Sequence, residues 1–154
     1  IGMLVEYSLE DYDRIQQVNV RAAYRLCQAV ATGMMRRQLG WIVNITSVWG
    51  IVSKAERSAY SASKFAIQGF SRALALELAP YNILVNCVAP GFVDTDLTRQ
   101  TLGEDGIARM VSQVPMGRLV QPAEIASCVK FLASAENTYL TGQTIVIDGG
   151  FTSA

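Results

Sequence analysis

Two residues that can move a proton together lie one helical turn apart in the stretch Ser58–Ala66, SAYSASKFA. Tyr60 and Lys64 are four residues apart, so a helix would place both side chains on one face. An ammonium favours the ionised form of a neighbouring phenol, and such a tyrosine can donate or accept a proton. The small residues between them leave room beside the helix for a flat ligand. A surface pair with no role in catalysis would show the same spacing.

Ser47 is the third candidate for chemistry. It lies thirteen residues before Tyr60 and directly after the stretch 41–46, WIVNIT. That stretch is rich in β-branched and apolar residues, which predicts a strand buried on both faces, as in a parallel sheet. Ligands of such sheets collect at the carboxyl ends of the strands. We therefore expect the Ser47 hydroxyl to hold a substrate oxygen while Tyr60 transfers a proton.

The elements that must position these residues alternate along the chain. Ser8 and the acidic residues after it predict a helix from about residue 9 to about 37, and further helices are expected over 59–79 and 122–133. Strands are expected near 41–46, 83–88 and 143–147. The polar stretch 94–114 has weak helical character and is expected to be a loop, long enough for a lid. This order predicts an α/β protein with a parallel sheet.

The expected helix over 59–79 carries few charges, namely Lys64, Arg72 and Glu77. A helix of this composition is buried on more than one side. The sheet covers one side, and a second copy of the chain is the simplest cover for the other. Burial inside a larger monomer would explain the same composition.

Composition excludes several classes of function. The 154 residues, 51% of them hydrophobic, suit one domain, and 13 Lys and Arg balance 13 Asp and Glu, so we expect no nucleic-acid partner. No apolar stretch approaches the ~18 residues of a membrane span, and the start lacks a signal-peptide pattern, so no membrane partner is expected. Histidine is absent, which excludes Ser-His-Asp catalysis and histidine metal sites. We expect no metal.

The three cysteines are Cys27, Cys87 and Cys128. They lie far apart and are odd in number, so they form neither a metal-binding spacing nor a disulfide framework. Each has apolar neighbours and is predicted to be a buried structural thiol. This pattern fits a reducing, cytoplasmic setting.

Several motifs together resemble the short-chain dehydrogenase/reductase family, in matching order and spacing from about residue 8 to the end. The end of the chain and the stretch 115–118 look most like the 3-oxoacyl-carrier-protein reductase branch. Sugar and polyol dehydrogenases of the family share these features, so the substrate stays open. The matching motifs are Asn44-Ile45-Thr46-Ser47, Tyr60 with Ser61-Ala62-Ser63-Lys64, the stretch NCVAPGFVDT over 86–95, Thr141-Gly142-Gln143 and Asp148-Gly149-Gly150.

The resemblance implies catalytic roles. Tyr60 would be the general acid in carbonyl reduction, Lys64 would favour its phenolate and bind the nicotinamide ribose, and Ser47 would hold the carbonyl. Asn19 would support a water-mediated proton relay, or it would satisfy backbone groups at a helix irregularity. The resemblance also implies NAD(P)(H) as cofactor, a small-molecule carbonyl or alcohol substrate, and a homo-oligomer, either a dimer or a tetramer.

The same resemblance implies further binding residues. Pro90 and Gly91 would shape the nicotinamide pocket, and Val93 and Thr95 would contact the carboxamide, although Thr95 can also cap a short helix. The polar stretch 96–114 would be a mobile substrate loop.

Two aromatic residues are candidates for the substrate pocket. Trp49 and Phe92 would line it next to Ser47, or they would be ordinary packing. Asp148 is expected to serve the structure of a strand end rather than the chemistry.

The sequence departs from the family at its start. The family begins with a strand, a turn of the Thr-Gly-x-x-x-Gly-x-Gly type that binds the cofactor pyrophosphate, and a helix. These, and the residue that sorts NAD from NADP, are not found here. We therefore expect residues 1–154 to be one partial, doubly wound Rossmann-like domain, the C-terminal part of a longer reductase. The alternatives are an independent short protein, an inactive remnant, or a silent oligomerisation module that lacks the cofactor-binding half.

Overall fold

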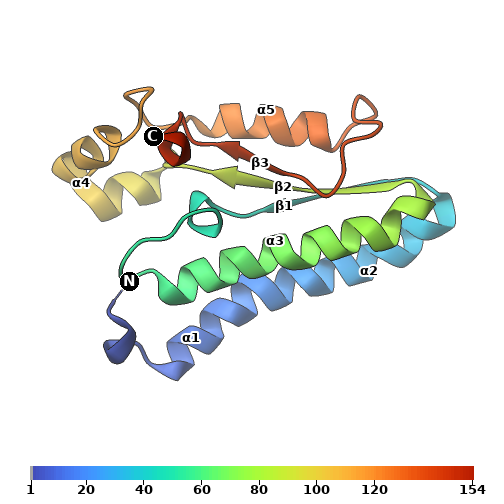
Figure 1. Ribbon diagram of the computed structural model, residues 1–154, viewed down its shortest axis with the longest axis horizontal. Coiled ribbons are helices and arrows are strands. Elements are labelled where there is room, and N and C mark those ends of the chain that lie inside the picture. The colour runs from blue at the N-terminus through green and yellow to red at the C-terminus, as the bar shows by residue number, and fades with distance from the viewer. Residues whose placement is uncertain (1) are drawn as a thin grey trace.

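The computed structural model, which describes residues 2–154, contains a parallel sheet of three strands (Figure 1). The strands are β1 (Gly40–Ile45), β2 (Ile83–Pro90) and β3 (Thr144–Ile147), in the order β1-β2-β3. Gly40 pairs with Ile83 in β2, and Cys87 of β2 pairs with Thr144. The α/β class and the parallel sheet expected from the alternating elements are confirmed. Because the strands are parallel, their carboxyl ends meet at one edge of the sheet.

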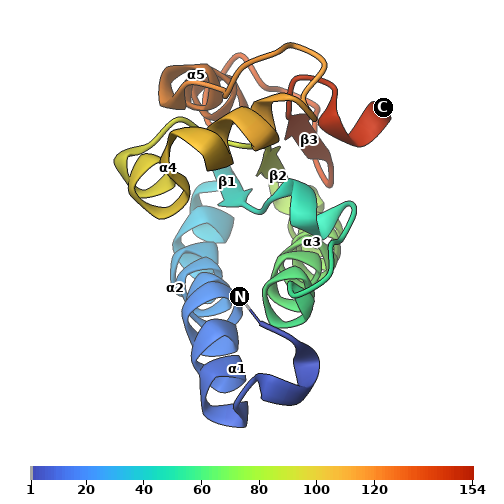
Figure 2. The same ribbon diagram turned by 90° about the vertical axis from the view of Figure 1, so that its left-hand side faces the viewer.

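Helices cover both faces of the sheet. The helices α2 (Ala22–Arg37) and α3 (Ser58–Leu78) lie on one face, and α5 (Pro122–Leu132) lies on the other (Figures 1 and 2). All 8 residues of the central strand β2 are buried, as expected for a strand with helices on both sides. In the part of the chain described here, no helix has the length and apolar character needed to cross a bilayer.

The first expected helix, over 9–37, has the right extent but is not regular throughout. It begins with α1 (Leu9–Gln16), capped by Ser8, whose Oγ accepts a hydrogen bond from the Asp11 N–H at 3.0 Å. A π-helical segment, Gln17–Arg21, then joins α1 to α2, and we call it the π turn. The helix α2 ends where Gln38 adopts a left-handed conformation with φ of 56°.

The prediction of a loop over 94–114 is wrong, because most of this stretch forms the helix α4 (Asp96–Val111). Thr95 caps the start of this helix, because its Oγ1 accepts a hydrogen bond from the Thr98 N–H at 3.1 Å. The negative charge of Asp96 in the first turn interacts favourably with the helix dipole. Gly103, with φ of 62° and ψ of 179°, breaks the helix in its middle. This interruption explains why the sequence shows only weak helical periodicity.

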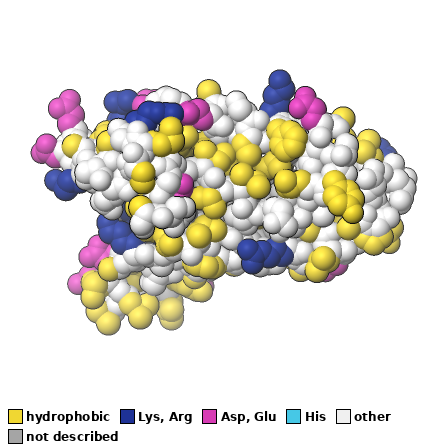
Figure 3. All heavy atoms as spheres, turned by 45° about the horizontal axis from the view of Figure 1, so that its top comes forward, with side chains coloured by type: hydrophobic (Ala, Val, Ile, Leu, Met, Phe, Trp, Pro, Cys, Tyr) yellow, Lys and Arg dark blue, Asp and Glu magenta, His cyan; other side chains and the backbone are white. Residues whose placement is uncertain are grey.

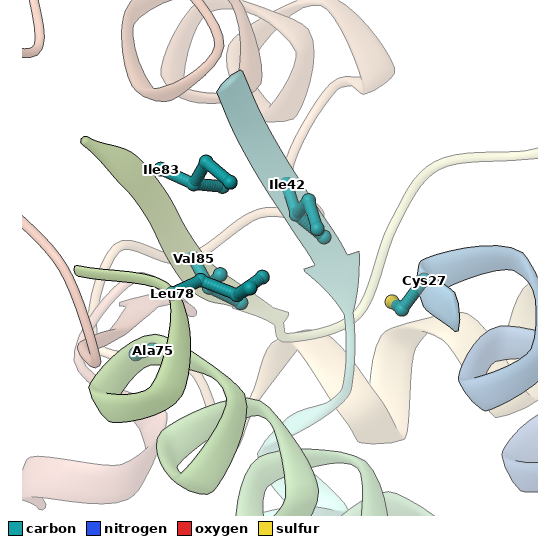
Figure 4. Packing of buried hydrophobic residues seen from close by; sticks show 6 residues of the cluster. All are labelled: Cys27, Ile42, Ala75, Leu78, Ile83 and Val85. Carbon is teal, nitrogen blue, oxygen red and sulfur yellow. The ribbon is translucent and has the colours of Figure 1, made fainter. Parts of the chain in front are cut away.

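The main hydrophobic cluster lies between the sheet and the pair α2 and α3. Burial raises the pKa of the Cys27 and Cys87 thiols, so both stay protonated at neutral pH. The prediction of buried thiols is correct for these two, whereas Cys128 is only half-buried. The cluster contains Cys27, Ile42, Ala75, Leu78, Ile83 and Val85 (Figure 4).

Candidate active site

Tyr60 and Lys64 lie in the first turns of α3, on the same face of the helix. The Lys64 Nζ is 5.5 Å from the centroid of the Tyr60 ring. It donates a hydrogen bond of 3.2 Å to the carbonyl oxygen of Ile45, the last residue of β1. Burial lowers the pKa of the Lys64 ammonium. The pair expected from the sequence therefore lies beside the carboxyl end of β1.

Ser47 follows this strand end and is buried, with 7% of its surface exposed. Its Oγ accepts a hydrogen bond of 3.2 Å from the Trp49 N–H, so Ser47 caps the short 3-10 segment Val48–Gly50. The hydroxyl proton can therefore be donated to another oxygen. Gly50 packs on α3, because a Cβ at this position would lie 3.1 Å from the carbonyl carbon of Lys64. The segment after β1 thus packs on the backbone of Lys64. Figure 2 shows this segment beside α3.

Asn19 reaches the same part of α3 from the π turn. Its Nδ2 donates a hydrogen bond of 3.0 Å to the Ser63 Oγ, which in turn donates to the carbonyl oxygen of Tyr60 at 2.7 Å. The Asn19 amide is thus linked to the turn of α3 between Tyr60 and Lys64. π turns of this kind often occur at functional sites.

Pro90 and Gly91 lie where the tips of β2 and β3 approach each other. Pro90 pairs with Ile147, and the Gly91 N–H donates a hydrogen bond of 2.9 Å to the Ile147 carbonyl oxygen. A Cβ on Gly91 would lie 2.8 Å from the Cα of Asp148, so no larger residue fits without a shift of the backbone. Asp148 accepts hydrogen bonds from the Thr152 N–H and hydroxyl, which confirms its expected role at the strand end. Burial raises the pKa of Asp148, but the hydrogen bonds from Thr152 and from the backbone N–H of Gly150 together leave the pKa below its usual value.

The loop after β2 is held in place at several points. Val93 forms an isolated parallel bridge with Val120, and the Asp94 N–H donates to the Val120 carbonyl oxygen at 2.9 Å. Hydrogen bonds from Arg99, at 2.7 Å, and from a neighbouring amide lower the pKa of the Asp94 carboxyl. Thr95 caps α4, as the sequence suggested. These contacts fix the positions of both residues expected to contact a carboxamide.

Three aromatic rings connect the loops that follow β1, β2 and β3. Trp49 lies 6.1 Å from Phe92 and 5.7 Å from Phe151 between ring centroids, and the two phenylalanines are 4.9 Å apart. The sequence predicted two of these rings and missed Phe151. The available signal was its position directly after Gly149 and Gly150, which end the third expected strand.

The candidate residues thus fall into two groups at neighbouring strand ends of one sheet edge. This arrangement combines a proton donor, a cation and a hydroxyl that can hold a carbonyl oxygen. Among residues 2–154, no group of three or more His, Cys, Asp or Glu is placed to hold a metal ion. The first group comprises Asn19, Ser47, Tyr60 and Lys64, and the second comprises Pro90, Gly91, Val93 and Thr95.

The burial of Lys64 predicts a pH-dependent cost to stability. Because its pKa in the folded chain lies below the 10.5 of the unfolded chain, the unfolded state binds more protons between these two values. Stability contributed by this group therefore rises with pH through that window, and the penalty is fully present below it. We expect the wild type to gain stability relative to Lys64→Met as the pH rises through this window, because only the wild type carries the buried ammonium.

Lys54→Met is the matched control, because Lys54 is exposed. Urea unfolding followed by circular dichroism between pH 7 and pH 10.5 measures all three proteins. A stability difference between the wild type and Lys64→Met that does not change with pH would contradict the burial cost.

Comparison with known proteins places the chain in a family. The family model described as enoyl-(acyl carrier protein) reductase matches residues 1–152. The 3-oxoacyl-[acyl-carrier-protein] reductase FabG of Vibrio cholerae is 40% identical over 149 residues, which are 97% of this chain and 61% of that protein. The chain therefore belongs to the short-chain dehydrogenase/reductase family. It spans about 61% of the length of this curated relative.

Solved structures agree with this assignment. The gluconate 5-dehydrogenase of Burkholderia cenocepacia, in complex with NADP and tartrate, has a TM-score of 0.94 and 32% identity, over 99% of this chain and 60% of that one. ElxO with NADP bound has a TM-score of 0.95 and 29% identity, over 100% of this chain and 63% of that one. The chain thus has the Rossmann-like fold of the corresponding part of both structures.

Proposed function

We propose that the natural protein carrying this chain is an NAD(P)(H)-dependent oxidoreductase that reduces a ketone of the 3-oxoacyl type to an alcohol. A bound nicotinamide would supply the hydride. Tyr60 donates the proton to the carbonyl oxygen, and Ser47 holds that oxygen by a hydrogen bond. The positive charge of Lys64 stabilises the negative charge that develops on the Tyr60 oxygen. Asn19 supports the transfer of the proton from solvent.

One observation carries the proposal. The Lys64 ammonium donates a hydrogen bond to the Ile45 carbonyl at the end of β1 and lies over the Tyr60 ring. The 3-10 segment Val48–Gly50, which Ser47 caps, packs on the backbone of Lys64. Three groups with complementary roles therefore share one sheet edge, where ligands of α/β proteins bind. The Vibrio cholerae relative is a 3-oxoacyl-[acyl-carrier-protein] reductase, which supports the 3-oxoacyl class of substrate.

The second group of residues is proposed to bind the nicotinamide of the cofactor. We propose that Pro90 and Gly91 shape its pocket, and that Val93 and Thr95 contact its carboxamide. The close approach of Gly91 to Asp148 leaves no space for a side chain between the strand tips, and the Val93 backbone is fixed by Val120. NADP in the two related structures supports NAD(P)(H) as the cofactor.

The aromatic rings are proposed to line the substrate pocket. The Trp49 N–H donates a hydrogen bond to the Ser47 Oγ, so Trp49 lies next to the residue that would hold the carbonyl. Phe92 and Phe151 extend the same apolar wall. An apolar wall of this kind suits the carbon chain of an acyl substrate better than a polyol.

We also propose that the protein assembles as a homo-oligomer, a dimer or a tetramer, through α2 and α3. Large apolar side chains on their outer faces are exposed, including Leu26 at 68%, Phe65 at 48% and Leu76 at 79%. Hydrophobic side chains also gather near the middle of the opposite face of the molecule, which carries α5 (Figure 3). Sedimentation equilibrium tests this proposal, and a monomer at all concentrations would contradict it.

Titration with NADPH and NADH, followed by nicotinamide fluorescence, tests the enzyme against a silent assembly module. The 154-residue chain and the full-length natural protein are both measured. Saturable binding by either protein supports the oxidoreductase, and binding by the full-length protein alone shows that residues outside this chain complete the site. If neither protein binds either nucleotide, the oxidoreductase proposal is wrong.

A further inference from the structure

Gln68 is a buried polar residue that the proposed reaction does not use. It lies on α3, four residues after Lys64, and only 4% of its surface is exposed. A buried amide is costly unless its donors and acceptor are satisfied. The partners that satisfy it therefore show what this side chain holds together.

Both donor bonds of the amide go to the segment that carries Ser47. The Gln68 Nε2 donates to the carbonyl oxygen of Gly50 at 2.8 Å and to the Thr46 Oγ1 at 3.2 Å. On its other side, the Gln68 Oε1 accepts a hydrogen bond of 3.3 Å from the Thr144 hydroxyl of β3. The Gln68 amide thus joins α3, the loop after β1 and β3 by hydrogen bonds.

The Thr46 hydroxyl, which accepts a hydrogen bond from Gln68, also contacts Ser47. The Thr46 Oγ1 accepts a hydrogen bond from the Ser47 N–H, and it also lies 3.3 Å from the Ser47 carbonyl oxygen. Gln68 is therefore bonded to the residue before Ser47 and to the residue that ends the 3-10 segment after it. Such a link fixes both ends of the short segment that orients the Ser47 hydroxyl.

The fit at Gly50 makes the link specific to this pair of residues. A Cβ at Gly50 would lie 2.5 Å from the Gln68 Nε2, so the glycine allows the amide to reach the loop. Gly50 also packs on the backbone of Lys64. The loop consequently sits at a fixed distance from the turn that carries the lysine.

We propose that Gln68 is a positioning residue, which holds the Thr46–Gly50 segment so that the Ser47 hydroxyl stays in register with Tyr60 and Lys64. The expected effect on rate rests on the proposed function, in which Ser47 holds the carbonyl oxygen of the substrate. The expected effect of Gln68 on the order of the loop does not depend on that function. A hydroxyl misplaced by about 1 Å can cost on the order of 100-fold in rate.

Trp49 reports directly on the order of this segment. Residues 1–154 contain two tryptophans, Trp41 and Trp49, so a Trp41→Phe background of the 154-residue chain leaves Trp49 as the single tryptophan, which excitation at the red edge of the absorption band selects over the tyrosines. In that background we expect Gln68→Met to raise the acrylamide quenching constant of Trp49 by about twofold, because the segment opens locally. Ser71→Ala is the matched control: Ser71 is a buried polar residue of the same helix and accepts a bond from Asn44, away from the loop. It should leave the quenching unchanged.

The kinetic test uses the full-length protein with NADPH and a 3-oxoacyl substrate. We expect Gln68→Met to lower kcat by roughly 10- to 100-fold with little change in nucleotide affinity, since only the carbonyl-holding residue is displaced. Thr46→Val removes the hydrogen bond from Gln68 at its loop end and should likewise lower kcat with little change in nucleotide affinity. It serves as the second variant if Gln68→Met does not fold.

The outcomes separate the two proposals. Unchanged quenching and an unchanged kcat in both variants would overturn the positioning role, as would a disordered segment that leaves kcat intact. A wild-type protein that binds neither nucleotide would instead overturn the proposed function. The quenching result would still show whether Gln68 orders the loop.

Discussion

Replacing Tyr60 with phenylalanine is expected to lower kcat for ketone reduction by about 10²- to 10⁴-fold, the range for loss of a general acid. The ring remains in place, so its contact with the Lys64 ammonium, 5.5 Å from the centroid, is retained. The affinity for NADPH should therefore stay nearly unchanged. With the full-length protein, steady-state assays of NADPH oxidation measure kcat, and fluorescence titration measures the affinity for NADPH.

Tyr139→Phe provides the control for this substitution. Tyr139 is 94% exposed and distant in sequence from both groups of site residues. Its loss of a hydroxyl should change neither rate nor binding. If Tyr60→Phe kept even a tenth of wild-type turnover, the assignment of the proton donor would be wrong.

Gly91→Ala should be the most disruptive small change in the second group of residues. The added Cβ would lie 2.8 Å from the Cα and 2.9 Å from the Cβ of Asp148, and backbone at this point cannot rotate away as a flexible side chain would. Overpacking of this kind costs about 1–3 kcal/mol in the free energy of unfolding. The shift would also move the turn that Asp148 holds through Thr152.

Gly69→Ala is the matched control for Gly91→Ala. Gly69 lies inside α3, and a Cβ there meets nothing within 4 Å. Alanine at an exposed helix position should stabilise the chain by up to about 1 kcal/mol. Urea unfolding measures the change in the free energy of unfolding for both variants. Equal effects of the two substitutions would contradict the steric account of Gly91.

The sequence predicted the parts of the fold that depend on strong local patterns. β-branched stretches bounded by glycine and proline indicated all three strands, and the four-residue spacing indicated that Tyr60 and Lys64 share a face. Two features were not predictable in this way. Gly103 interrupts α4 and breaks its periodicity, and the π turn around Asn19 leaves no mark in an apolar pattern that continues through it.

The candidate site shows a similar division. Residue types and spacing along one helix were sufficient to predict that Tyr60 and Lys64, the proposed proton-transfer pair, share a face. Gln68 follows Lys64 by the same four-residue step, so its place on that face could have been noticed. Its partners could not, because Thr46, Gly50 and Thr144 come from separate parts of the chain. Phe151 was missed for the same reason. Only the meeting of three strand ends brings it to Trp49 and Phe92.

Transfer of deuterium from the nucleotide to the ketone would show that this protein moves a hydride between them. The full-length protein is supplied with NADPH deuterated at the transferable position of the nicotinamide, and the alcohol is analysed by mass spectrometry. The account predicts one deuterium on the new carbinol carbon in the wild type, formed far more slowly by Tyr60→Phe. An alcohol without that deuterium, or equal rates of labelling in the two proteins, would contradict it.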